Sequence, residues 1–213
     1  MKNAEITEEM LSGLRLRVKD YLTDKRYIHV LGVEREAAAL GKIYLKDEVN
    51  ELRAAALLHD ITKRLSVEKQ LNLLDEFGII RCGDERIFPK LLHSKTAAAL
   101  IERDFPEFND ERIVSAVRWH TSGRAGMSVF DMLIYLADYI EDTRTFEDCV
   151  KLRAFFYDNL ARAESSEQLY SVLDKTMILS FDMTFRILME EGAPICRDTV
   201  EARNWFITKN IHS

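Results

Sequence analysis

The 213 residues are 47% hydrophobic and 31% charged, with only 8 glycines and 3 prolines and a net charge of −6. This composition is typical of one folded globular domain and excludes collagen-like and proline-rich chains. No apolar run approaches the ~20 residues of a membrane helix, no basic block suggests nucleic acid as a partner, and no signal peptide is visible. Three cysteines without CxxC spacing favour neither disulfides nor a thiolate zinc site, so we expect a cytoplasmic protein.

Taken in chain order, the sequence predicts an all-α fold, because apolar residues recur at helical spacing and period-two stretches are scarce. Thr7, Ser66, Ser94 and Asn109 are expected to begin helices as N-caps or first residues. The predicted helices cover residues 7–24, 26–44, 47–59, 66–77, 94–104, 109–120 and 127–142, then two or three in 146–192 and one after 194. A loop over 77–89, which includes Cys82 and Gly83, and a break over 121–126 separate them.

Four histidines lie at or near the ends of predicted helices, and the ordered set can be written His29, His59-Asp60, His93, His120 and Asp138. Each histidine alone is more often a structural residue, as we expect for His212, and Asp138 alone could cap a helix or pair with an arginine. Gaps of about one or two helices, however, let successive helices each direct one ligand to a shared centre. Imidazole and carboxylate together favour iron, manganese, cobalt or zinc over magnesium or calcium. Because His59 and Asp60 are adjacent on the chain, they can reach one centre only near the C-terminus of their helix.

Four cations near this set are candidate phosphate ligands: Arg26, Lys63, Arg124 and Arg144. Lys63 follows His59-Asp60 by one turn, and Arg124 lies in the break beside His120. Each could equally be an ordinary solvated cation.

Five segments around these residues resemble the HD-domain phosphohydrolases, an all-α superfamily, and within it the symmetrical diadenosine tetraphosphate hydrolases. The segments are residues 26–34, 56–63, 119–124, 137–141 and 194–204, in particular Trp119-His120-Thr121-Ser122-Gly123-Arg124 and Ala137-Asp138-Tyr139-Ile140-Glu141. The helical stretch over residues 155–190 is longer than is usual there.

The resemblance implies one or two divalent metal ions, with iron expected and manganese, cobalt or nickel as substitutes. One ion would be held by His29, His59, Asp60 and Asp138, and the other by Asp60, His93 and His120. Two such cations lower the pKa of a bridging water and clamp phosphoryl oxygens. The implied reaction converts a dinucleoside polyphosphate to two ADP, with Asp60 and Lys63 as catalytic residues. The implied substrate contacts are Arg26, Asp60, Ile61, Thr62, Lys63, His93, Thr121, Arg124, Arg144, Thr199, Arg203 and Asn204.

We expect a single domain over residues 1–213, in which a metal-binding core over about 24–145 is completed by C-terminal helices over about 146–213. A homodimer is compatible with the sequence. Two other functions stay open: a nucleotidase or phosphodiesterase that acts on another nucleotide at the same metal site, and a helical protein that binds nucleotide without turnover.

Overall fold

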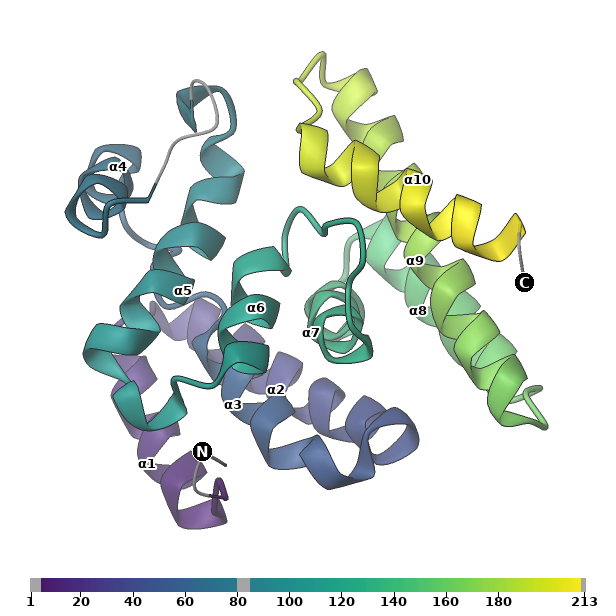
Figure 1. The fold of residues 1–213 in the computed structure, drawn as a ribbon, viewed down its shortest axis with the longest axis horizontal. Helices are drawn as coiled ribbons and strands as arrows, with labels where there is room; N and C mark the ends of the chain where they lie inside the picture. The colour runs from purple at the N-terminus through teal and green to yellow at the C-terminus, as the bar shows by residue number, and fades with distance from the viewer. Residues whose placement is uncertain (1–4, 80–84, 212–213) are drawn as a thin grey trace.

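The computed structural model describes residues 5–79 and 85–211 and is all-α within them, as predicted (Figure 1). Cys82, Gly83 and His212 lie outside the described residues. No helix in the described part is long and apolar enough to cross a membrane. The α-helices are α1 (Glu8–Lys19), α2 (Asp24–Tyr44), α3 (Val49–Leu58), α4 (Val67–Glu76), α5 (Leu92–Asp104), α6 (Glu111–Trp119), α7 (Val129–Ile140), α8 (Glu147–Leu160), α9 (Ser166–Glu190) and α10 (Arg197–Ile211). Short 3-10 turns are η1 (Lys46–Glu48), η2 (Glu85–Ile87), η3 (Pro89–Leu91) and η4 (Pro106–Phe108).

Two predicted helix caps are confirmed and two are wrong. Thr7 and Ser66 cap α1 and α4, and each side chain accepts a hydrogen bond from the N–H three residues on. Ser94 instead lies inside the first turn of α5, where its hydroxyl donates to a backbone carbonyl one turn back. The acceptor at the start of α6 is Asp110 and not Asn109, because 3-10 turn η4 occupies the residues just before it.

The first helix is also shorter than predicted. It ends at Lys19, and residues 20–23 turn the chain before Thr23 caps α2 by accepting a hydrogen bond from the N–H of Arg26. The chain turns again at η1, and α2 and α3 pack side by side.

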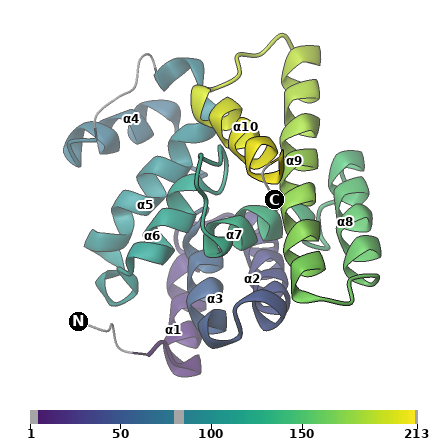
Figure 2. The same cartoon turned by 45° about the vertical axis from the view of Figure 1, so that its right-hand side comes forward.

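Most of the helices pack around one main hydrophobic core, and a small second cluster of Leu71, Leu74 and Leu92 joins α4 to α5. The main core includes Leu14 of α1, Leu52 of α3, Leu133 of α7, Phe156 of α8 and Phe181 of α9, all nearly or fully buried. Figure 2 shows α9 upright beside α7, with α8 on its outer side and α10 packed against it. The C-terminal helices therefore share the core of the preceding helices.

Helix α3 places the candidate site in the middle of the molecule. Its residues Leu52, Ala55 and Ala56 are fully buried, and the small alanines allow α2, α6 and α7 to approach closely. The helix ends at Leu58, so the chain leaves it at His59 in the interior. As predicted, His59 and Asp60 lie at and just beyond a helix C-terminus, where adjacent side chains can reach one centre.

Candidate metal centre

The structure brings the six predicted ligands together. His29 lies in the second turn of α2, His59 and Asp60 follow α3, His93 lies in the first turn of α5, His120 ends α6, and Asp138 lies in the last turn of α7. Five helices thus contribute side chains to one place, as the spacing along the sequence predicts.

Asp60 lies between two pairs of imidazoles. Its Oδ2 is 3.8 Å from Nε2 of His29 and 3.5 Å from Nε2 of His59. Its Oδ1 is 3.2 Å from Nε2 of His93 and 3.8 Å from Nε2 of His120. Each carboxylate oxygen therefore faces its own pair of ring nitrogens, which is the arrangement that a carboxylate bridging two ions requires.

Asp138 completes the side of the centre that His29 and His59 form. Its Oδ1 is 3.0 Å from Nε2 of His29 and 3.6 Å from Nε2 of His59. The Asp138 side chain is 18% exposed, and it is paired with Arg144. Asp138 therefore does both things that the sequence allowed: it pairs with an arginine, and it lies among the histidines.

The histidine rings present their Nε2 atoms to the centre. The Nδ1–H groups of His59 and His120 donate to backbone carbonyls three residues back, at 2.6 and 2.7 Å. Among the described residues, Nε2 of His29 and of His59 are buried without any hydrogen-bond partner, although carboxylate oxygens lie within 4 Å. Buried polar atoms normally have a partner, so these two nitrogens fit a site that binds a further atom.

The donor set fits a divalent transition metal. Ligand atoms of His29, His59 and Asp138 lie within 4.8 Å of one another, and so do those of His59, Asp60 and His120. Imidazole nitrogen with carboxylate oxygen is the combination that such metals accept and that magnesium and calcium do not prefer.

Electrostatics favour positive charge at this centre. Burial opposes protonation of His59, but the Asp60 and Asp138 carboxylates outweigh it and raise the pKa of His59 to about 10. At His93 burial dominates and lowers the pKa to about 4, and it also lowers the pKa of His120. Burial would raise the pKa of Asp60, but the surrounding imidazoles hold it well below its usual range. The carboxylates therefore stay ionised and attract a proton or a metal ion.

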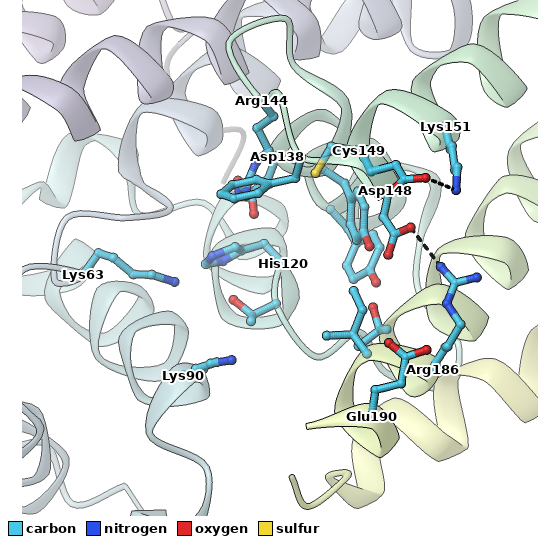
Figure 3. A pocket seen from close by; sticks show the side chains of 17 residues that line it. Lys63, Lys90, His120, Asp138, Arg144, Asp148, Cys149, Lys151, Arg186 and Glu190 are labelled. Atoms are coloured by element: carbon cyan, nitrogen blue, oxygen red, sulfur yellow. Dashed lines mark hydrogen bonds and ion pairs between the residues drawn. The ribbon is translucent and has the colours of Figure 1, made fainter. Parts of the chain in front are cut away.

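A cavity of about 880 Å³ opens from this centre. Figure 3 shows Lys63 and Lys90 on one side of it, His120 and Asp138 at its base, and Arg186 on the opposite wall formed by α9. A second cavity of about 360 Å³ adjoins the first and has a largely apolar lining. The two cavities share the lining residues Lys90, Thr121 and Thr184.

Three predicted phosphate contacts lie at the centre or in the larger cavity. Arg26 donates to Oδ2 of Asp60 at 3.0 Å, and Arg144 pairs with Asp138. Nζ of Lys63 is 4.0 Å from Oδ1 of Asp60, and burial lowers the pKa of this lysine.

The predicted threonine contacts differ in accessibility. Thr121 lines both cavities, and Thr199 lines the smaller one. Thr62 is buried and its hydroxyl donates to the His93 carbonyl, while the side chain of Ile61 lies in the core. The Thr62 hydroxyl thus holds the backbone of His93 in place.

The remaining predicted contacts point elsewhere. Arg124 pairs with Asp131 at 3.2 Å, and Arg203 pairs with Asp182 on α9. Asn204 is exposed, and neither it nor Arg203 is among the residues that line the two cavities.

Some residues at the site were not singled out from the sequence. Lys90, Phe146, Thr184 and Arg186 line the larger cavity, but lone residues in a loop or on an amphipathic helix carry no sequence signal. Glu141 contacts His29 and did have a sequence signal, since this acid directly follows a strongly apolar helix, three residues after Asp138.

Known proteins are similar to this chain in sequence and in fold. The family model described as HD domain matches residues 26–143. Two proteins named symmetrical bis(5'-nucleosyl)-tetraphosphatase are 32% identical: the one from Bacillus subtilis over 90% of this chain and 94% of its own, and the one from Halalkalibacterium halodurans over 88% and 91%. A Staphylococcus aureus protein of the same name is 28% identical over 88% of this chain and 90% of its own.

A solved structure from Clostridium acetobutylicum, described as a predicted HD superfamily hydrolase involved in NAD metabolism, superposes with a TM-score of 0.80. It is 31% identical and covers 93% of this chain and 97% of its own. The family match covers more than half of the chain, including every residue of the converged histidine and aspartate set. With that set, the helical architecture and these relatives, the chain belongs to the HD-domain family of hydrolases.

Proposed function

We propose that this chain is a metal-dependent phosphohydrolase that cleaves diadenosine tetraphosphate at its central phosphoanhydride and releases two ADP. The observation that carries the proposal is Asp60, whose two oxygens face separate imidazole pairs beside a cavity lined with cations. The names of the B. subtilis, H. halodurans and S. aureus relatives support the substrate class.

We propose that the bound metal is iron and that manganese, cobalt or nickel can substitute for it. His29, His59 and Asp138 would hold one ion, His93 and His120 a second, and Asp60 would bridge them. Such ions lower the pKa of a bound water and neutralise phosphoryl oxygens.

The nearby cations support the chemistry of the phosphate chain. In the hydrolysis a water oxygen forms a bond to one central phosphorus, the bond from that phosphorus to the bridging oxygen breaks, and the bridging oxygen leaves with the other ADP. One proton of the water is released. Negative charge develops on the leaving oxygen. The side chains of Lys63, Arg26 and Arg144 lie beside the carboxylates of the centre, where their positive charges would stabilise it.

The two adjoining cavities support cleavage at the middle of the substrate. We propose that each takes one nucleoside half, so that the central anhydride lies near His120 and Thr121. The smaller cavity has apolar walls from η3, α9 and the segment before α10, which suit a nucleobase, and Thr199 lies among them.

Product analysis tests the proposal. Protein purified without oxygen is analysed for metal content and incubated with diadenosine tetraphosphate, and the nucleotides are separated by chromatography. We expect ADP as the only nucleotide product, and chelation of the metal should abolish its formation. ATP plus AMP would contradict central cleavage. Turnover of mononucleotides or cyclic dinucleotides alone would replace the substrate, and tight nucleotide binding without turnover in iron, manganese and cobalt buffers would favour a binding protein.

A further inference from the structure

The Nδ1 atoms of His29, His59 and His120 are held in two different ways, whereas Nδ1 of His93 lies 3.2 Å from the ammonium of Lys63. His59 and His120 end their helices, so each Nδ1 reaches a free backbone carbonyl in its own last turn. His29 lies inside α2, where the helix already uses the carbonyls. Its Nδ1 lies instead 3.0 Å from Oε1 of Glu141, which follows α7. A side chain at the end of another helix thus does for His29 what the backbone does for His59 and His120.

Glu141 is fixed from all sides. The residue is fully buried, and burying a carboxylate costs several kcal/mol unless hydrogen bonds compensate. Oε2 accepts from the backbone N–H of Thr143 at 2.7 Å, and Oε1 accepts from the Thr143 hydroxyl at 2.7 Å. Arg153 of α8 donates to the Glu141 carbonyl, which anchors the backbone as well. With the bond from His29, the carboxylate has an assigned donor at each oxygen.

Helix α2 contains a gap that fits this carboxylate. Gly32 follows His29 by one turn and is buried, and a Cβ at its position would lie 2.2 Å from Oε2 of Glu141. A glycine inside a helix costs about 1 kcal/mol relative to alanine, so its presence in α2 calls for a physical reason. Space for the Glu141 carboxylate is that reason.

We propose that Glu141 is a positioning residue that holds the proton of His29 on Nδ1 and so keeps the lone pair of Nε2 directed at the metal centre, and that Gly32 is the space in which it sits. The inference rests on the metal site of the proposed function. A carboxylate on the outer nitrogen of a metal-binding histidine fixes its tautomer and orientation and increases its basicity. Glu141 would act through His29 and does not touch substrate.

Two substitutions test the proposal by different physical means. In Glu141→Gln one carboxylate oxygen becomes an NH₂ group, so the side chain can no longer accept at both oxygens. Where that NH₂ faces His29, it favours the tautomer with the proton on Nε2. In Gly32→Ala the carboxylate is pushed away by the new methyl group. Gly13→Ala is the matched control, because Gly13 also lies inside a helix and nothing lies within 4 Å of its Cβ position.

The measurement is the affinity of the metal-free protein for Co²⁺, by competition with a chromophoric chelator, together with the visible spectrum of the cobalt protein. We expect Glu141→Gln and Gly32→Ala to weaken cobalt binding at the site that contains His29 by roughly 10–100-fold and to change the spectrum, with circular dichroism and the Gly13→Ala protein unchanged. Long-range ¹H–¹⁵N spectra of metal-free protein should show His29 with its proton on Nδ1 in the parent and a changed tautomer in Glu141→Gln.

Unchanged cobalt affinity in folded Glu141→Gln and Gly32→Ala proteins would overturn the proposal. So would an equal loss in the Gly13→Ala control. Because the readout uses metal alone, it is independent of the substrate. Weakened cobalt binding in a protein that does not cleave diadenosine tetraphosphate would leave this inference intact and remove the proposed function.

Discussion

At the scale of single residues, Asp60 has a place that no other ligand shares. It is buried, it faces both imidazole pairs, and it also accepts a hydrogen bond from Arg26. Loss of its carboxylate therefore removes a ligand from both sides of the centre at once.

We expect Asp60→Ala to keep the helical fold and to lower turnover of diadenosine tetraphosphate by more than the roughly 10–100-fold typical of an outer partner of a metal ligand. Metal content should fall in the same protein. Elemental analysis, circular dichroism and the product assay check these three expectations. Asp142→Ala, which removes an exposed carboxylate near the end of α7, is the control and should retain activity. A fully active Asp60→Ala protein would remove the metal site from the mechanism.

Substitution of Lys63 tests substrate binding separately from metal binding. Its ammonium lies beside Asp60 and His93 and also lines the larger cavity. We expect Lys63→Ala to lower kcat/KM by roughly 100-fold, because a charged donor to the phosphate chain is lost, while metal content stays intact. Lys90→Ala, which removes an exposed cation from the same cavity, should have a smaller effect. A Lys63→Ala protein that had lost its metal would show that this lysine supports His93 and not the phosphate chain.

The convergence of the six candidate ligands was predictable from the sequence because imidazoles and carboxylates at helix ends are chemically unusual and their order is specific. The orientation of their rings was not predictable. It depends on Glu141 and on backbone carbonyls, and only the folded chain brings Glu141 to His29. The contact expected of Arg124 was inferred from its position beside His120, and that of Arg203 from the family resemblance. In the folded chain Asp131 and Asp182 pair with these two side chains.

At the scale of helices and turns, the segment between α6 and α7 joins the metal centre to the C-terminal helices. Gly123 has a φ of +65°, and a Cβ there would lie 2.8 Å from the Phe181 ring of α9 and 3.3 Å from Ala202 of α10. The segment that follows His120 can therefore lie flat on α9 only without a side chain at this position.

We expect Gly123→Ala to destabilise the fold by about 2–5 kcal/mol, the sum of a left-handed backbone cost and overpacking against a buried ring. Gly126→Ala is the matched control. Gly126 has a φ of +70° with nothing within 4 Å, so the backbone cost of about 1–2 kcal/mol remains and the clash does not. Urea unfolding measures both, and equal losses would contradict the packing role of Gly123.

Helix existence was easier to predict than helix ends. Apolar periodicity is repeated along a whole helix, whereas a cap depends on one side chain. Ser94 and Asn109 are good capping residues by type, yet the 3-10 turns at Pro89 and Pro106 move the helix starts away from them. Prolines in such turns are a local signal that could have shifted both predictions.

At the scale of the whole molecule, α8, α9 and α10 complete the core, and residues of α8 and α9 also form one wall of the larger cavity. Tyr135 of α7 and Phe181 of α9 have ring centroids 5.3 Å apart, and the Ser180 hydroxyl lies 3.4 Å from that of Tyr135. We therefore expect residues 1–213 to unfold as a single unit.

The two tryptophans report on the two parts of the chain separately. Trp119 ends α6 beside the metal centre, and Trp205 lies on α10. We expect Trp119→Phe and Trp205→Phe proteins at equal metal loading to give fluorescence transitions that coincide with the loss of helical circular dichroism. A transition of Trp205 at distinctly lower urea than that of Trp119 would show that the C-terminal helices form an independent unit.

Because the candidate ligand side chains come from five helices, any cation bound among them would also fasten those helices to one another. Binding to the native state alone adds resistance to unfolding that grows with the free concentration of the ion. A cell short of that ion would lose the protein to its proteases as well as its activity, since opened chains are the ones degraded. The lifetime of the protein would then follow the cell's metal supply without any dedicated regulator.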